Sequence, residues 1–195
     1  MCIRDRIRIH GRGGQGVVTA AEMLALAGFM EKHHAQAFPS FGSERTGAPV
    51  VAFARLASHE IRVREPVLEP NVVLVQDRTL LDSVNVFEGL QPDGYVLINT
   101  DKTIEGLGLS ELAARLPKGH CMTVPATRFA LEKIGRPLPG AGMLAGMAAM
   151  TGMMKLDSVI AAYNEKFSGR IALANAEVAK LAFDYIAEHQ GDSSC

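Results

Sequence analysis

Short apolar runs, separated by polar and glycine-rich segments, mark out the elements of this chain. Residues 7–10 alternate apolar and polar side chains, which is typical of a half-buried strand. Residues 17–31 are rich in Ala, Leu and Met and predict a helix. Residues 35–38 form a second extended stretch that ends at Pro39. The chain therefore begins with a predicted strand, a glycine-rich turn, a helix and a second strand.

Two nearly continuous apolar runs, 71–76 and 94–99, are typical of central strands covered on both faces. Residues 50–56 and 61–64 are shorter β-like runs with a brief polar stretch between them. We expect these two runs to form a hairpin, which would make the sheet mixed. A last strand is predicted over 120–124.

Helical patterns separate and follow these strands. Residues 78–86 predict a short helix and 109–116 another, while the chain beyond Pro125 is helix-rich, with Gly and Pro punctuation over 135–142. The alternation of strands and helices predicts an α/β fold, a three-layer α/β/α domain with a mixed, mostly parallel sheet and a helical C-terminal region. We expect a single domain over 7–195.

The first six residues stand apart from this pattern. They can be encoded by ATG TGT ATA AGA GAC AG, which resembles a transposase-adapter sequence used in DNA sequencing. We therefore interpret 1–6 as a non-native leader and exclude it from the fold. Reading the genomic locus upstream of Ile7 tests this interpretation.

Composition and charge narrow the class of protein. Of 195 residues, 48% are hydrophobic and 21% charged, which suffices for a packed core without disulfides or metal. The net charge of −1 gives no excess of positive charge that would indicate binding to nucleic acid or to an anionic membrane. No apolar run approaches the ~20 residues that span a bilayer, and the chain begins without a secretory signal. The three cysteines are too widely spaced for a disulfide framework, so we expect a cytoplasmic protein.

A glycine-rich loop between the first strand and the first helix is the main candidate for a binding site. It consists of Gly11, Arg12, Gly13, Gly14, Gln15 and Gly16. Backbone N–H groups in such a loop converge on an anion at the helix N-terminus, so a phosphate or pyrophosphate is the expected ligand. The side chains of the loop can add a positive charge and an amide. The alternative is a tight turn whose glycines only allow close packing.

The spacing of Gly11, Gly13 and Gly16 also satisfies the dinucleotide-binding fingerprint. That fingerprint requires an acidic residue at the end of the second strand. Glu31 has a suitable spacing but precedes the predicted second strand. A free-standing dinucleotide-dependent reductase is therefore a weaker alternative, and a pure assembly module without a ligand is a third.

Longer segments extend the glycine motif into a resemblance that covers essentially all the chain beyond Ile7. Residues 11–20, 35–49, 61–62, 69–73 and 141–146 resemble the gamma subunit of pyruvate:ferredoxin oxidoreductase and its 2-oxoacid:acceptor relatives. Residues 42–47 differ from the pyruvate-type pattern, which has a second basic residue where this chain has Thr46. The 2-oxoacid therefore stays open between pyruvate, 2-oxoglutarate, branched-chain and aryl 2-oxoacids.

The resemblance implies a subunit of a complex that oxidatively decarboxylates a 2-oxoacid to acyl-coenzyme A and CO2. Its partners would be thiamine-diphosphate-binding and iron–sulfur subunits, with ferredoxin or another acceptor receiving the electrons. The complex would use thiamine diphosphate, Mg2+, iron–sulfur clusters and coenzyme A, none of them bound solely by this chain, which would be inactive alone. The chain has no Cys-x-x-Cys that would hold a cluster, in agreement with this division of labour.

The same resemblance implies cofactor-binding residues, and no catalytic or metal-binding ones, in this chain. They are the six loop residues, Gly11 to Gly16, together with Glu44 and Arg45. Arg45 would pair with a phosphate or carboxylate, or else with Glu44 to hold its loop.

Four methionines recur on one face of the predicted C-terminal helices and predict either core packing or an adaptable subunit interface, with core packing favoured. They are Met143, Met147, Met150 and Met154.

Overall fold

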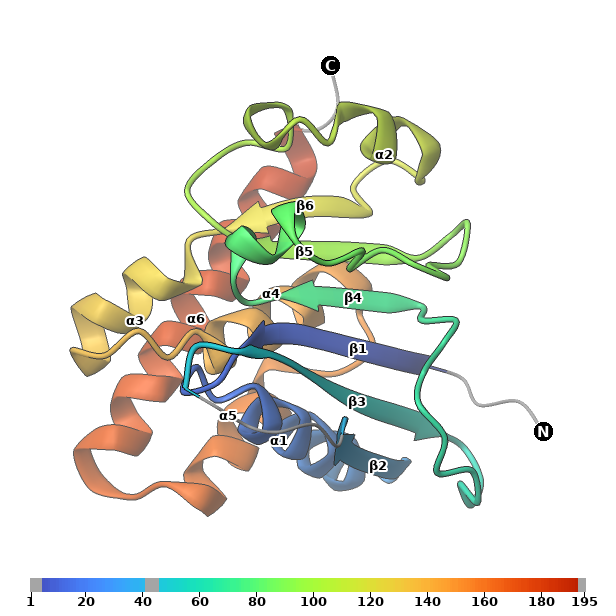
Figure 1. Ribbon diagram of the computed structural model, residues 1–195. Helices are drawn as coiled ribbons and strands as arrows, with labels where there is room; N and C mark the ends of the chain where they lie inside the picture. The colour runs from blue at the N-terminus through green and yellow to red at the C-terminus, as the bar shows by residue number, and fades with distance from the viewer. Residues whose placement is uncertain (1–4, 41–45, 193–195) are drawn as a thin grey trace.

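A computed structural model describes residues 5–40 and 46–192, with the side chains up to residue 190. Six strands form one sheet in the order β2-β3-β1-β4-β5-β6, and Figure 1 shows them stacked with β6 at the top and β2 at the bottom. β1, β4, β5 and β6 run parallel, while β3 pairs antiparallel with both β1 and β2. The strands are β1 (Asp5–Arg12), β2 (His34–Pro39), β3 (Pro49–Ala57), β4 (Val72–Val75), β5 (Tyr95–Asn99) and β6 (Cys121–Val124).

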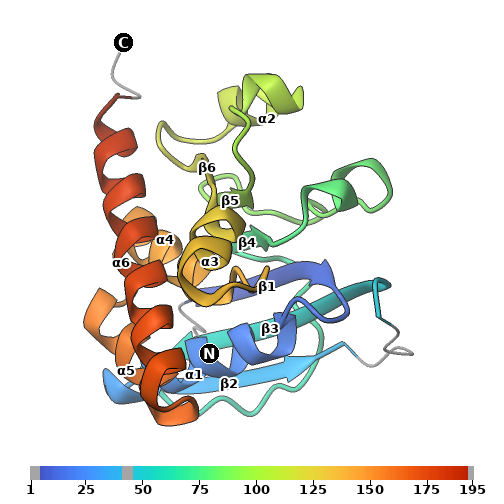
Figure 2. The ribbon, with the colours of Figure 1, turned by 90° about the vertical axis from the view of Figure 1, so that its left-hand side faces the viewer.

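Helices cover the two faces of the sheet unequally, as Figure 2 shows. One face packs against α1 (Val17–Met30), α3 (Ala126–Ile134), α4 (Gly140–Thr151), α5 (Leu156–Lys166) and α6 (Gly169–Asp192). The other face carries a smaller cluster under irregular chain, η1 (Arg78–Asp82), η2 (Glu105–Leu107) and α2 (Ser110–Arg115). The α/β fold with a mixed, mostly parallel sheet is confirmed. The predicted helix over 78–86 is shorter than expected, because only a 3-10 turn forms there.

The central strand β4 explains the continuous apolar runs. All four of its residues are fully buried, with Val72 and Leu74 facing the large helical cluster and Val73 and Val75 facing the smaller one. Alternation along a strand sends successive side chains to opposite faces, so a strand covered on both sides needs apolar residues throughout. The methionine row lies in the large cluster, which confirms the core prediction for Met143, Met147, Met150 and Met154.

The predicted hairpin between 50–56 and 61–64 is wrong. β3 covers the first run, but its two edges are taken by β1 and β2, so no edge is left for a third partner. The chain over 61–64 has no regular structure. Just beyond it, the guanidinium groups of Arg55 and Arg8 donate to the backbone carbonyls of Glu65 and Val67, which hold this segment against the sheet as irregular chain.

β1 begins at Asp5, inside the segment that the sequence sets apart as a leader. Asp5 and Arg6 pair with β3, whose residues continue the ladder to Leu56. The Arg6 side chain also donates to Asn71 at 3.2 Å. The exclusion of Asp5 and Arg6 from the fold is therefore wrong, because their backbone pairs with β3 and the Arg6 side chain adds a bond to Asn71.

Two polar side chains of β1 are buried beneath the smaller cluster. Arg8 is 7% exposed and donates to the carbonyls of Val86 at 2.9 Å and Glu88 at 2.5 Å. His10 is 4% exposed, and its Nε2 has no hydrogen-bond partner among the described residues. Burial, aided by the positive charge of Arg8, lowers the pKa of His10 to about 4. His10 is thus neutral in the folded chain over the physiological range.

We predict that His10 makes the free energy of unfolding depend on pH between 6.5 and about 4. The pKa of His10 is lower in the folded chain than in the unfolded chain. Its contribution to the free energy of unfolding is therefore complete above pH 6.5 and is lost as the pH falls, because the unfolded chain takes up the proton first. Relative to His10→Leu, the wild type should lose at most about 3 kcal/mol more on acidification, at ~1.4 kcal/mol per pKa unit. Urea denaturation at several pH values measures this difference, with exposed His34→Leu as the control. Equal pH profiles for wild type and His10→Leu would contradict it.

α4 lies between the sheet and α6, and its glycines permit this close approach. A Cβ atom added at Gly146 would lie 3.0 Å from Leu97 Cδ2 and 3.4 Å from Ile186 Cγ1. Both neighbours are fully buried, so little space is available for them to move.

Gly146→Val should therefore lower the free energy of unfolding by about 1–3 kcal/mol, the usual cost of overpacking a core. Lys180→Val introduces the same β-branched side chain on the exposed face of α6 and serves as the control. Urea denaturation of both variants tests the prediction. A Gly146→Val protein as stable as wild type would show that α4 has room to shift.

Candidate functional site

The glycine-rich loop joins β1 to α1 and is shaped by three of its glycines. Gly14 and Gly16 have φ of 94° and 74°, a region that side chains other than glycine rarely adopt. At Gly11 the constraint is space, since an added Cβ would lie 2.5 Å from Val17 Cγ2. Two glycines thus give the turn its shape, and the third lets the helix start close to the strand.

Several backbone N–H groups at the head of α1 have no acceptor among the residues that the structure describes. Gly13 donates to the carbonyl of Ala48 at 2.9 Å and Gln15 to that of Arg12 at 3.1 Å. The N–H groups of Gly14, Gly16 and 17–19 donate to no residue in the described part of the chain. Such groups carry the positive end of the helix dipole and favour an anion.

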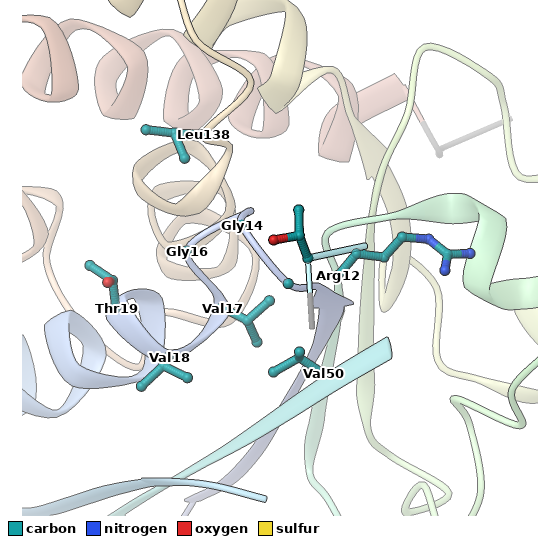
Figure 3. A pocket seen from close by; sticks show the side chains of 10 residues that line it. Arg12, Gly14, Gly16, Val17, Val18, Thr19, Val50 and Leu138 are labelled. Carbon is teal, nitrogen blue, oxygen red and sulfur yellow. The ribbon is translucent and has the colours of Figure 1, made fainter. Parts of the chain in front are cut away.

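An open cavity of about 490 Å3 lies beside these donors. The loop and the first turn of α1 form one side of it, and Val50 and Leu138 contribute from other segments, as Figure 3 shows. Thr46 also lines the cavity. In this view the Arg12 side chain extends away from Thr19 and Leu138, so the guanidinium does not fill the space. The cavity offers backbone donors and small or apolar side chains.

A side-chain network behind the loop holds its two polar residues. Gln15 accepts from the Arg12 backbone N–H at 2.8 Å through Oε1 and donates to Asp77 at 2.8 Å through Nε2. The Arg12 guanidinium donates to Thr79 at 2.8 Å and to the Gly47 carbonyl at 3.0 Å, and its Nε lies 3.4 Å from Asp77. These contacts fix the loop on the neighbouring strand end and on the start of β3.

Asp77 is the anionic centre of this network. Burial alone would raise its pKa, but hydrogen bonds from Thr79 and Gln15 and the charge of Arg12 outweigh burial and lower it. Asp77 is therefore ionised at neutral pH and balances the positive charge of Arg12. Part of the positive charge of Arg12 is thus neutralised by Asp77 within the protein.

The structure brings the predicted loop residues Gly11 to Gly16 together at one end of the sheet. Glu44 and Arg45 lie outside the described residues. Thr46, the next residue along the chain, forms an isolated bridge with Gly13 and lines the cavity.

Asp77 and Thr79 were not predicted from the sequence as site residues. A signal for them exists, because both follow the apolar run that predicts β4. Residues just beyond the carboxyl ends of parallel neighbouring strands share one edge of the sheet. β1 and β4 are such neighbours, so the residues after β4 lie next to the loop.

The strands beside the loop are arranged differently from those of a dinucleotide-binding fold. Beside β1, the position of a second parallel strand is taken by antiparallel β3, and β2 lies at the far edge. Glu31 caps the opposite end of α1, where its carboxylate accepts from the Lys155 backbone N–H at 2.7 Å. Glu31 is therefore engaged at the wrong end of the helix to bind a ribose.

Within residues 5–40 and 46–192, no group of three or more His, Cys, Asp or Glu side chains is arranged to hold a metal ion. None of the helices there combines the length and the apolar character needed to cross a membrane.

Sequence comparison places the whole of this architecture in one family. Residues 6–185 match the family model described as pyruvate ferredoxin/flavodoxin oxidoreductase. The chain is 48% identical to the pyruvate synthase subunit PorC of Methanothermobacter marburgensis, over 95% of this chain and 98% of the relative. It is 46% identical to the pyruvate/ketoisovalerate oxidoreductases common subunit gamma of Pyrococcus abyssi, over 91% and 95% of the two chains.

Solved structures agree. The pyruvate oxidoreductase subunit PORC of Thermotoga maritima superposes with a TM-score of 0.77 at 35% identity, covering 92% of this chain and 95% of that one. The 2-oxoglutarate:ferredoxin oxidoreductase of Magnetococcus marinus shares the fold at 14% identity, with a TM-score of 0.71, and 94% of this chain corresponds to 31% of that larger chain. The chain described here therefore belongs to the pyruvate ferredoxin/flavodoxin oxidoreductase family, as a gamma subunit of an oxidoreductase complex.

Proposed function

We propose that the glycine-rich loop of this gamma subunit holds a phosphate-bearing cofactor in a complex that converts a 2-oxoacid to acyl-coenzyme A and CO2. The phosphates would be those of coenzyme A or the diphosphate of thiamine diphosphate. Thiamine-diphosphate and iron–sulfur subunits would be the partners, with ferredoxin or another acceptor taking the electrons. The name pyruvate synthase on one relative, and ketoisovalerate on another, favour a pyruvate or branched-chain substrate.

The observation that carries the proposal is the set of N–H groups at the head of α1 that have no acceptor in the described part of the chain. Those of Gly14, Gly16 and 17–19 have no described acceptor, and this part of the loop lines an open cavity. Hydrogen bonds to a charged group contribute about 1.5–3 kcal/mol each, more than neutral ones. A phosphate bridging two or three of these donors would therefore be bound well without a lysine or arginine contact.

The side chains around the cavity suit positioning better than chemistry. Those of Val17, Val50 and Leu138 are aliphatic, and Arg12 is held by Thr79 and Gly47. Thiamine diphosphate supplies decarboxylation chemistry when bound, and in this proposal the partner subunits hold its reacting end. The part of this chain is to bind and orient phosphate groups through fixed backbone donors.

Gly14→Val in the assembled complex should raise the KM for coenzyme A by about tenfold or more, the equivalent of losing ~1.4 kcal/mol of binding. Among the described residues, a Cβ at Gly14 meets nothing closer than 4.0 Å, so the change acts through the backbone at its φ of 94° and not through a clash. Steady-state kinetics with varied coenzyme A and a saturating 2-oxoacid measure the effect.

Gly152→Val is the matched control. Gly152 also has a positive φ, 64°, and open space around it, but it ends α4 and is absent from the cavity lining. The two variants should lose similar stability, while only Gly14→Val changes the KM. Unchanged kinetics in a fully assembled Gly14→Val complex would remove the loop from coenzyme A binding.

A further inference from the structure

The strand β2 has one side without a neighbour. It is the last strand at its edge of the sheet, and Figure 1 shows it at the bottom of the stack. The Ser40 N–H donates to the Val51 carbonyl at 2.8 Å and so continues the β2–β3 ladder. Because bonded and non-bonded pairs alternate along antiparallel strands, the N–H groups of Ala35 and Ala37 point outward. Outside the sheet, no backbone carbonyl of the described residues accepts from these two.

A groove of about 500 Å3 lies beside the first half of β2 and has two walls. One wall is formed by Phe29 and Lys32 at the end of α1, which covers the helical face of the sheet. The other is formed by residues of the segment 60–64. That segment leads to Glu65, whose carbonyl accepts from Arg55, and the neighbours of Arg55 in β3 face the helical cluster. A strand added to β2 would therefore lie between walls on both faces of the sheet.

Each wall of the groove combines an apolar side chain with a cation. Phe29 is 70% exposed on one wall, and Ile61 lines the other. Lys32 and Arg64 are both exposed, and neither forms an ion pair with another described residue. The groove thus offers an apolar contact and a free positive charge on each side of the strand edge.

The other polar groups of the lining do not offset these cations. Glu60 carries the carboxylate of the described lining, and it is already paired with exposed Arg62 at 3.0 Å. The remaining polar side chains are those of His33, His34 and Gln36, none of which is an anion. The groove therefore has an excess of positive charge that an acidic ligand would balance.

The backbone at Lys32 is also unusual for a lysine. Its φ is 66°, and it follows the C-terminal cap of α1. The next residue, His33, donates to the Gly28 carbonyl at 3.0 Å, a bond typical of a helix end at which glycine is the usual residue. Glycine adopts this φ without strain, so the turn by itself does not account for a lysine there.

We propose that β2 accepts a further strand, an extended acidic segment of another subunit of the complex. Its backbone would bond to the outward groups of Ala35 and Ala37. Its carboxylates would pair with Lys32 and Arg64. In strand addition the main-chain bonds give affinity and alternate side chains give specificity. A second copy of β2 would fit less well, because His34–Pro39 contains no carboxylate to pair with the cations.

An open strand edge favours uncontrolled association unless it carries charges or is covered. Within His34–Pro39 there is no Lys, Arg, Asp or Glu, and Pro39 removes a donor only at the end of the strand. The chain belongs to a multi-subunit complex, so a partner chain is available to cover this edge. The proposal depends on membership of that complex and not on phosphate binding at the glycine-rich loop.

Hydrogen exchange at single-residue level, in the free chain and in the assembled complex, tests the proposal. The amides of Ala35 and Ala37 should exchange at least about tenfold more slowly in the complex. Those of Gln36 and Phe38, which face β3, are protected in both states and serve as the internal control. Equal exchange of Ala35 and Ala37 in the two states overturns the proposal. Protection in the free chain that grows with its concentration would indicate pairing with a second copy and would also overturn it.

A double variant, Lys32→Gly with Arg64→Ser, tests the acidic character of the segment. Glycine suits the φ of residue 32, so the Tm of the free chain should not fall. In the complex, the protection of Ala35 and Ala37 should decrease at least about fivefold, since exposed ion pairs each contribute modestly. Lys118→Ser, at an exposed cation just before β6 on the opposite edge, is the matched control. Protection that the double variant leaves unchanged would overturn the assignment of an acidic partner.

Discussion

The contact between Gly11 and Val17 sets the geometry on which the candidate site depends. A Cβ at Gly11 would meet Val17 Cγ2 at 2.5 Å, so α1 can start this close to β1 only because the position is glycine. The short connection that results leaves the N–H groups at the head of α1 without an acceptor among the described residues. Gly14 and Gly16 accept the positive φ that this turn requires. Strand, turn and helix together place backbone N–H donors at one edge of the sheet, where we propose that an anion binds without a charged side chain.

The surrounding sheet supports this loop from both sides. On one side, antiparallel β3 begins next to Gly13, whose N–H bonds to Ala48. On the other, β4 delivers Asp77, which holds Gln15 and balances Arg12. Replacing the usual parallel neighbour with β3 also moves β2 to the edge, which removes the ribose-binding acid of a dinucleotide fold. The same glycine spacing thus serves a different arrangement of strands.

Local sequence patterns predicted much of this structure, but they did not predict which strands lie next to one another in the sheet. The apolar runs that became β4 and β5 and the glycine turn were predicted correctly, because burial on both faces and positive φ impose strict residue types. The hairpin over 50–56 and 61–64 was wrong, since both runs suit a strand and only the whole sheet decides which edge is free. Asp77 was missed because its role depends on β1 and β4 being neighbours. Glu44 and Arg45, which lie outside the described residues, stay predictions.

Amide chemical shifts of the 15N-labelled full chain during a titration with coenzyme A test the central claim most directly, because they report on each backbone N–H by itself. Saturable shifts at Gly14, Gly16 and the first turn of α1, reproduced in part by pyrophosphate, are the result that the account predicts. Coenzyme A binding that leaves these amides unmoved, or no binding by the chain or its assembled complex, would contradict it.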